Sequence, residues 1–155
     1  VDLDRALWVI PAEHTKAKRE HRVPLQPQAV TLLSALPKLA SSELLFPSPR
    51  GGELSDMALS QLMRGMRERG ELKDEAVPHG FRSTFRDWAA ELTDYPDEIR
   101  KVASMHTVGD AVKEAYQRTD LLEKRRHLMA DWADYMDQEV RSCVTTQAPV
   151  GGSND

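Results

Sequence analysis

Four short stretches of the 155-residue chain carry side chains that can act on a phosphate group. A histidine and an arginine stand three positions apart in the run His79-Gly80-Phe81-Arg82, at the start of an amphipathic segment. On a helix this spacing turns both side chains to neighbouring faces, and the free N–H groups of a helix start favour an anion. An isolated HxxR pair is more often a surface pair or a capping histidine, so it gains meaning only in combination.

A second histidine and a tyrosine follow at His106 and Tyr116. Tyr116 lies at helical spacing from Val108 and Val112, so a tyrosine packed on the core is the default interpretation. A phenol, with an ordinary pKa of about 10, is a weak nucleophile at neutral pH and needs nearby cations or a base. The chain offers three candidates for that role: Lys16, Arg82 and His106.

Basic residues concentrate between His14 and Arg22, where four lysines and arginines face a single acid, Glu20. This run lies between two short segments rich in β-formers, Ala6–Ile10 and His21–Leu25, which predict an antiparallel hairpin with a basic tip. Such tips are usually only solvated. One also suits a lysine that must reach beside a leaving group, and Lys16 is the candidate.

Helical periodicity predicts most of the remaining chain. Pro27 suits a first helical turn, and Pro37 should end or kink that helix. Ser55 is a plausible N-cap for a second helix, which Gly70 closes. Further helices are expected over residues 78–92, 96–103, 109–118 and 121–140.

The apolar positions of two of these helices predict the core. The 78–92 helix has one narrow stripe, with Arg82 and Arg86 on its shoulder; the stripe consists of Phe81, Phe85, Trp88 and Leu92. The expected buried set of the last helix is Leu121, Leu122, Leu128, Met129, Trp132, Tyr135 and Met136. The fold class is therefore mainly α with a small antiparallel β-hairpin near the N-terminus (α+β), as one domain over residues 1–141 and a flexible tail over 142–155.

The amino-acid composition and net charge limit the compartment and the kinds of partner that are expected. The 40% apolar and 30% charged fractions fit a soluble globular chain, and no apolar stretch or N-terminal signal indicates a membrane protein or a secreted one. A single cysteine, Cys143, forms no internal disulfide and favours a cytoplasmic location. The net charge of −4 requires that any polyanion be met by a local basic patch.

Other chemistries have weaker support. The chain lacks GxSxG, HExxH, GxxxxGK[ST], GxGxxG and CxxC patterns, which removes the basis for hydrolase, ATPase and dinucleotide functions. Aspartates repeat every three residues along the last helix, at Asp131, Asp134 and Asp137. We interpret them as its solvent-exposed face rather than as a metal site. A helix-turn-helix over residues 55–92 would need a connection of three or four residues, and the chain has about eight there.

Taken in order, these elements resemble the catalytic domain of the tyrosine recombinases, specifically that of the prophage integrases. The similarity covers about Trp8 to Tyr135 and is closest in three phrases. They are Thr15-Lys16 through Arg22-Val23-Pro24-Leu25, then His79-Gly80-Phe81-Arg82-Ser83-Thr84-Phe85-Arg86, and finally His106-Thr107-Val108-Gly109-Asp110 leading to Ala115-Tyr116-Gln117-Arg118-Thr119-Asp120-Leu121-Leu122.

The resemblance implies a reaction. Tyr116 attacks a DNA phosphodiester in line, leaving a 3′-phosphotyrosyl link and a free 5′-hydroxyl, without a metal or a nucleotide cofactor. Arg82 and His106 stabilise charge on the non-bridging oxygens, His79 shares this task or accepts the tyrosine proton, and Lys16 protonates the departing oxygen. The partner is double-stranded DNA, held by a homotetramer in the full-length protein. Phosphate contacts are expected from Lys18, Arg19, Arg64, Arg67 and Arg86.

The sequence departs from the family in one respect. The family carries another catalytic arginine on a helix upstream of the hairpin, whereas the only arginine before the hairpin here is Arg5, in no such helix. We therefore expect a fragment that lacks this arginine and the core-binding domain, and that alone neither recombines DNA nor recognises an attachment site. The alternative function is a non-catalytic helical DNA-binding or accessory module with the same fold.

Overall fold

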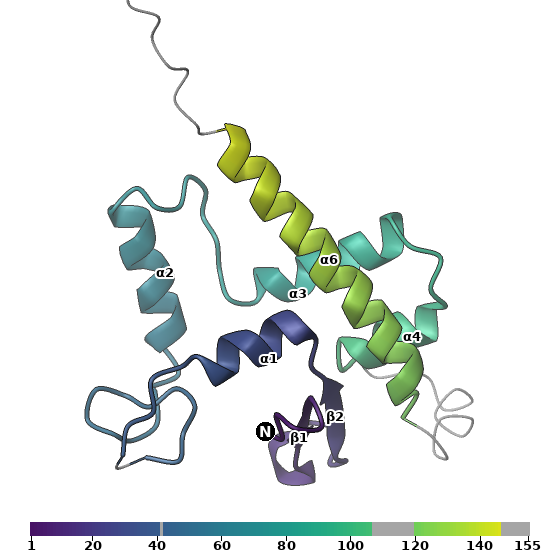
Figure 1. Cartoon of the computed structure of the whole chain (residues 1–155), viewed down its shortest axis with the longest axis horizontal. Coiled ribbons are helices and arrows are strands. Elements are labelled where there is room, and N and C mark those ends of the chain that lie inside the picture. Colours follow the sequence, from purple (N-terminus) through teal and green to yellow (C-terminus); the bar gives the residue numbers. More distant parts are fainter. Residues whose placement is uncertain (41, 107–119, 147–155) are drawn as a thin grey trace, which may run out of the picture.

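The computed structural model describes residues 1–40, 42–106 and 120–146 and shows a mostly helical chain with one two-stranded sheet (Figure 1). The elements, in chain order, are β1 (Leu7–Ile10), the 3-10 helix η1 (Ala12–His14), β2 (His21–Pro24), α1 (Pro27–Ser34), α2 (Ala58–Glu68), α3 (Gly80–Glu91), α4 (Asp97–Ala103) and α6 (Leu122–Thr146). The predicted fold class is confirmed. None of the helices in the described ranges has the length and apolar character needed to span a membrane.

The predicted hairpin is present and its tip is ordered by a threonine. β1 and β2 pair antiparallel, with Leu7 opposite Pro24 and Ile10 opposite His21. Thr15, only 5% exposed, lies inside the connection. Its hydroxyl oxygen accepts the Arg19 N–H at 3.1 Å and donates to the Arg19 carbonyl oxygen at 2.8 Å. The basic tip is therefore folded back on itself.

The core lies where α3, α4 and α6 meet. Its buried side chains are Phe85, Trp88, Ala89, Ile99 and Leu128. Aromatic rings from α3 and α6 dominate it: the ring centroids of Trp88 and Trp132 are 4.9 Å apart, and the Phe85 ring meets Trp132 edge-on at 5.5 Å. Edge-to-face packing is a favoured geometry for aromatic pairs, and the Trp88–Trp132 pair is tilted, with 52° between the ring planes.

The predicted apolar stripe of α3 is buried only in its middle. Phe81 is 67% exposed and Leu92 is 65% exposed, so the expectation that they face the core is wrong. Of the four stripe positions, only Phe85 and Trp88 on the central turns of α3 belong to the core cluster with residues of α4 and α6. On α6 the prediction that Met136 is buried is also wrong, because its side chain is 42% exposed.

The last helix is longer than its apolar pattern suggested. α6 continues to Thr146, so residues 142–146 of the expected tail are helical, and the end predicted near Val140 is too early. Residues 147–155 of that tail, like the helix expected over 109–118, lie outside the described residues.

Helices α1 and α2 contribute no buried residue. α1 ends three residues before Pro37, in agreement with the expected stop. α2 stands apart from the other helices (Figure 1), and its Leu59 and Leu62 are 57% and 55% exposed. It begins at Ala58 with Met57 as N-cap, so the predicted Ser55 cap is wrong.

The end of α2 follows the prediction. Gly70 has φ +75° and ends the helix. Its N–H donates to the Arg67 carbonyl oxygen at 2.9 Å, and the Glu71 N–H donates to the Met66 carbonyl oxygen at 2.9 Å. This pair of bonds is the Schellman motif, which needs a left-handed residue at that position.

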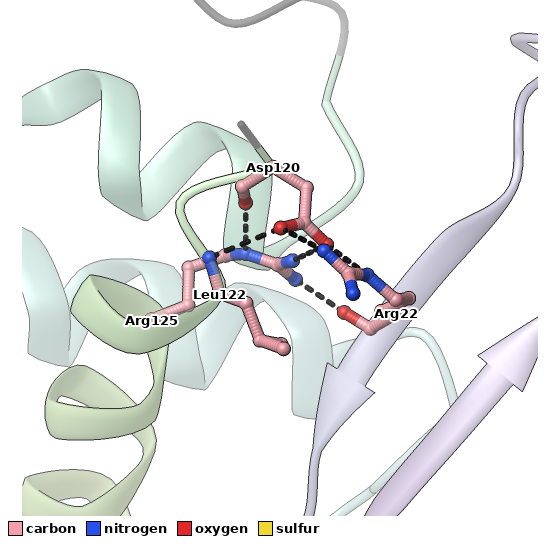
Figure 2. A network of polar contacts seen from close by, with 4 residues as sticks. All are labelled: Arg22, Asp120, Leu122 and Arg125. Carbon is pink, nitrogen blue, oxygen red and sulfur yellow. Dashed lines mark hydrogen bonds and ion pairs between the residues drawn. The ribbon is translucent and has the colours of Figure 1, made fainter. Parts of the chain in front are cut away.

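A polar network joins the hairpin to the start of α6 (Figure 2). The Asp120 carboxylate accepts hydrogen bonds from Arg22 Nε at 2.7 Å and Arg22 Nη2 at 2.6 Å. Arg125 Nη2 donates to the same carboxylate at 3.1 Å, and its Nε and Nη1 donate to the carbonyl oxygens of Asp120 and Arg22 at 2.9 and 2.6 Å. Arg125 is 1% exposed, so its buried charge is neutralised within the network.

Two titrating groups respond to this network. Burial raises the pKa of Asp120, but the hydrogen bonds from Arg22 and the charges of Arg125 and Arg22 outweigh it and hold that pKa below its ordinary value. His21 is affected in the opposite sense: burial and the positive charge of Arg125 lower its pKa to about 4, against a smaller opposing effect of Asp120. Its Nε2 is buried without a hydrogen-bond partner in the described part of the chain.

Replacing Trp88 by alanine should lower the free energy of unfolding by about 3–5 kcal/mol, because it removes a core ring that contacts three other aromatic rings. The matched control is Phe81→Ala on the same helix, which should cost about 0.5 kcal/mol because that ring is exposed. Urea unfolding followed by circular dichroism measures both values. Equal losses would show that the aromatic core is wrongly placed.

The lowered pKa of His21 predicts a loss of stability in mild acid. The unfolded chain takes up a proton near pH 6.5, whereas folded His21 stays neutral down to about pH 4. The free energy of unfolding should therefore be unaffected above pH 6.5 and fall by up to about 3 kcal/mol as the pH drops through this window. His21→Gln should flatten this dependence in denaturant titrations, and the exposed His127→Gln should leave it unchanged. Parallel pH profiles for both variants would refute the assignment.

Candidate functional site

The C-terminal turn of α4 sets the position of His106. Met105 follows the helix with φ +54°, its N–H bonded to the Val102 carbonyl oxygen at 3.1 Å. The His106 N–H bonds to the Lys101 carbonyl oxygen at 2.9 Å, which completes a Schellman motif. A left-handed conformation costs a residue with a side chain about 1–2 kcal/mol relative to the right-handed one. The turn that presents His106 is thus held in place against a conformational cost.

Arg82 and His106 meet at Ser104. Arg82 Nη1, from the first turn of α3, donates to the Ser104 carbonyl oxygen at 2.7 Å. His106 Nδ1 lies 3.2 Å from the same oxygen and 3.1 Å from Ser104 Oγ. Ser104 is 7% exposed, and its hydroxyl donates back to the Arg100 carbonyl oxygen at 2.9 Å. A buried, hydrogen-bonded serine therefore joins the two predicted site residues.

Arg86 completes this group, which we call the α3–α4 cluster: Arg82, Arg86, Ser104 and His106. Arg86 Nη1 lies 3.4 Å from His106 Nε2. Nδ1 of the ring thus faces Ser104 and Nε2 faces Arg86, and which nitrogen donates depends on the tautomer. Both arginines are exposed. Two guanidinium groups beside an imidazole form a binding place for the oxygens of a phosphate.

His79 lies at the N-cap of α3, one turn before Arg82. Its side chain is exposed and makes no capping hydrogen bond, so the interpretation of His79 as a helix-capping side chain is not supported. Its carbonyl oxygen accepts the Arg82 N–H at 3.1 Å. The sequence expectation that His79 and Arg82 share one end of a helix is confirmed.

The remaining basic candidates lie on other elements. Lys16, Lys18 and Arg19 are exposed at the hairpin tip, where Lys18 has φ +52°. No hydrogen bond or ion pair within the described residues joins Lys16 to the α3–α4 cluster. The structure therefore presents Lys16 to solvent and leaves its predicted place beside the phosphate as a prediction.

On α2, Arg64 and Arg67 line a surface hollow of about 300 Å³ whose other walls include Met63 and Val77. Arg67 Nη1 lies 3.9 Å from Glu75 Oε2. Within the described residues no hydrogen bond or ion pair joins these two arginines to the α3–α4 cluster, although Val77 and Pro78, which precede His79, also line the hollow.

Tyr116 lies outside the described residues, so its predicted role remains a prediction. The described residues on either side of it in sequence, His106 and Asp120, are both held by hydrogen bonds.

On the face of α6 that is predicted to contact solvent, two of the three aspartates accept hydrogen bonds from side chains of other elements. Tyr95 Oη donates to Asp131 at 2.7 Å, and Gln28 Nε2 donates to Asp137 at 3.2 Å. Throughout the described ranges, no three His, Cys, Asp or Glu side chains gather to hold a metal ion.

Sequence reasoning missed Ser104 and the partnership of Arg22, Asp120 and Arg125. A signal for the latter existed, because Arg125 occupies the apolar stripe of the last helix between Leu121 and Leu128. A charged side chain on a buried face requires a buried partner, which was the missing inference. Ser104 offered no such signal, since its role is set by the turn that follows it.

The sequence is similar to known proteins over most of its length. Residues 1–120 match the phage integrase family. The chain is 33% identical over 135 residues to the prophage integrase IntA of Escherichia coli (strain K12), covering 86% of this chain and 32% of that protein. It is also 33% identical over 152 residues to the integrase of Enterobacteria phage P4, covering 88% of this chain and 34% of that protein. The chain thus spans about a third of the length of these curated relatives. No solved structure matches it.

Proposed function

Because the chain belongs to the phage integrase family, we propose that it carries catalytic residues of a site-specific DNA recombinase that integrates or excises a prophage or a genomic island. The observation that carries this proposal is the meeting of Arg82 and His106 at the buried Ser104, on a surface that Arg86 makes more basic. These side chains come from two helices, and their gathering supports a phosphate-binding role.

In the proposed reaction Tyr116 Oη attacks the phosphorus of a DNA phosphodiester, forming a 3′-phosphotyrosyl bond as the bond to the 5′-oxygen breaks. Lys16 protonates that departing oxygen, and His79 shares the phosphate contacts or accepts the tyrosine proton. Arg82 and His106 hold the non-bridging oxygens as charge develops on them. Since one phosphodiester replaces another, rejoining needs no nucleotide cofactor, and the guanidinium groups supply the charge stabilisation without a metal.

The DNA partner fits the distribution of charge. The chain has a net charge of −4, so binding depends on local cations. Arg86 lies in the α3–α4 cluster, and the other proposed phosphate contacts lie on the hairpin tip and α2: Lys18, Arg19, Arg64 and Arg67. A duplex is long enough to contact such separated groups. Assembly as a tetramer on two duplexes and action in the cytoplasm complete the proposal.

The decisive experiment is covalent capture on DNA. The protein, at the full length that its gene encodes, is incubated with a duplex that carries its recombination site and a nick beside the cut, so that the short released strand with the free 5′-hydroxyl diffuses away. We expect a protein–DNA adduct on a denaturing gel and its complete loss in Tyr116→Phe, because only the phenol oxygen forms the bond. The Tyr135→Phe variant, which changes a tyrosine in the aromatic core, is the control and should keep the adduct.

Two results would contradict the proposal. An adduct that persists in Tyr116→Phe would assign the nucleophile elsewhere. Specific DNA binding without any adduct would favour the non-catalytic DNA-binding module.

Arg82→Ala should slow adduct formation by about 10²- to 10³-fold, the usual cost of removing one donor that stabilises transition-state charge. Arg82→Lys should stay well below the wild-type rate, because an ammonium group cannot reproduce the two-pronged guanidinium geometry. Rates are measured in single turnover at saturating DNA. Arg50→Ala, an exposed arginine on the connection before α2, serves as control. A wild-type rate in Arg82→Ala would remove Arg82 from the site.

A further inference from the structure

We propose that the network of Arg22, Asp120 and Arg125 positions the tyrosine nucleophile, by fixing Asp120, a near neighbour of Tyr116 in the sequence, against β2. This inference rests on the proposed function. Asp120 follows Tyr116 by four positions in the sequence, and it is the first residue described after it. The three residues are positioning residues, since none of them is placed in contact with DNA.

The first step of the argument is how completely Asp120 is held. Its Oδ2 accepts from Arg22 Nε and Arg125 Nη2, at 2.7 and 3.1 Å. Its Oδ1 accepts from Arg22 Nη2 at 2.6 Å and from the Leu122 N–H at 3.2 Å. Its main-chain carbonyl oxygen accepts from Arg125 Nε at 2.9 Å. Side chain and backbone of Asp120 are thus held by three different residues, as Figure 2 shows.

The second step is what Asp120 is held against. Arg22 belongs to β2 and pairs with Val9 of β1 in the hairpin whose tip carries Lys16. The bidentate Arg22–Asp120 contact therefore joins a strand of the hairpin that carries the proposed general acid to a residue four positions after the proposed nucleophile. The acid and the nucleophile must act on opposite sides of one phosphorus atom, and errors of about 1 Å in such placements cost rate steeply.

The third step separates positioning from folding. α6 is also held by Leu128 in the core and by the hydrogen bond from Gln26 Nε2 to the Arg126 carbonyl oxygen at 3.1 Å. The Arg22 side chain is 40% exposed, so losing its contact with Asp120 costs less stability than losing a contact of a fully buried charge. Arg125 is fully enclosed, so its removal threatens the fold itself. Arg22 is therefore the residue whose loss frees Asp120 while the fold is retained.

The experiment compares Arg22→Gln with Arg69→Gln in the adduct assay, using the full-length protein. Arg69 makes a similar bidentate contact with Glu71, just after the end of α2, and has no part in the proposed site. For Arg22→Gln we expect the single-turnover rate at saturating DNA to fall about 10- to 100-fold. The DNA concentration for half-saturation and the thermal unfolding midpoint should stay close to wild type. Arg69→Gln should match wild type in all three measurements.

A second variant, Asp120→Glu, keeps the negative charge between the two arginines but lengthens the side chain by one methylene. If the network acts by position, this variant also slows adduct formation while the unfolding midpoint stays close to wild type. A wild-type rate in Asp120→Glu, together with a rate loss in Arg22→Gln that follows its unfolding midpoint, would show a role confined to stability and overturn the inference.

The remaining outcomes are distinct. A wild-type rate at saturation in Arg22→Gln, or a change in half-saturation alone, would overturn positioning while the Tyr116-dependent adduct still supports the proposed function. Absence of any Tyr116-dependent adduct in the wild-type protein would instead overturn the proposed function, and this inference with it.

Discussion

The carboxylate of Asp120 between two guanidinium groups is the contact on which the arrangement of this chain depends most. It joins residues about a hundred positions apart, the second strand of the hairpin and the beginning of α6. The interaction is obligatory because Arg125 is fully buried: without Asp120 its charge would lie in the interior with only carbonyl oxygens as partners. The same burial that demands this pairing also leaves neighbouring His21 neutral, with its pKa lowered to about 4.

The aromatic core provides a second constraint, which acts on the candidate phosphate-binding surface. Phe85 and Trp88 bury one side of α3 against α6, so that Arg82 and Arg86 are turned outward. α4 then ends in a turn that brings the Ser104 carbonyl oxygen under both Arg82 and His106. A rigid apolar face thus orients a polar one, which suits a site that must hold charge-stabilising groups in place before substrate arrives.

The separation of the basic groups explains how an acidic chain can serve a polyanion. The lysines and arginines at the hairpin tip, on α2 and in the α3–α4 cluster are all exposed. The buried Arg125 instead forms an ion pair with Asp120 inside the protein. Only the exposed groups are free to replace counterions on a phosphate backbone. Net charge therefore says little about the surface that DNA would meet.

The sequence alone determined the elements and some of their ends: β-forming residues around a basic run placed the hairpin, apolar periodicity placed α3 and α6, and Gly70 placed the end of α2. These depend on short-range rules of backbone conformation, which are written in a few adjacent residues. Only the tertiary structure decided that Phe81 and Leu92 stay exposed, that Ser104 joins Arg82 to His106, and that Asp120 binds Arg22 and Arg125. The physical reason is that burial and pairing between distant residues depend on which elements meet and how far each extends. A local pattern records at most that a partner is needed, as Arg125 does in the apolar stripe of α6, and not which distant residue supplies it.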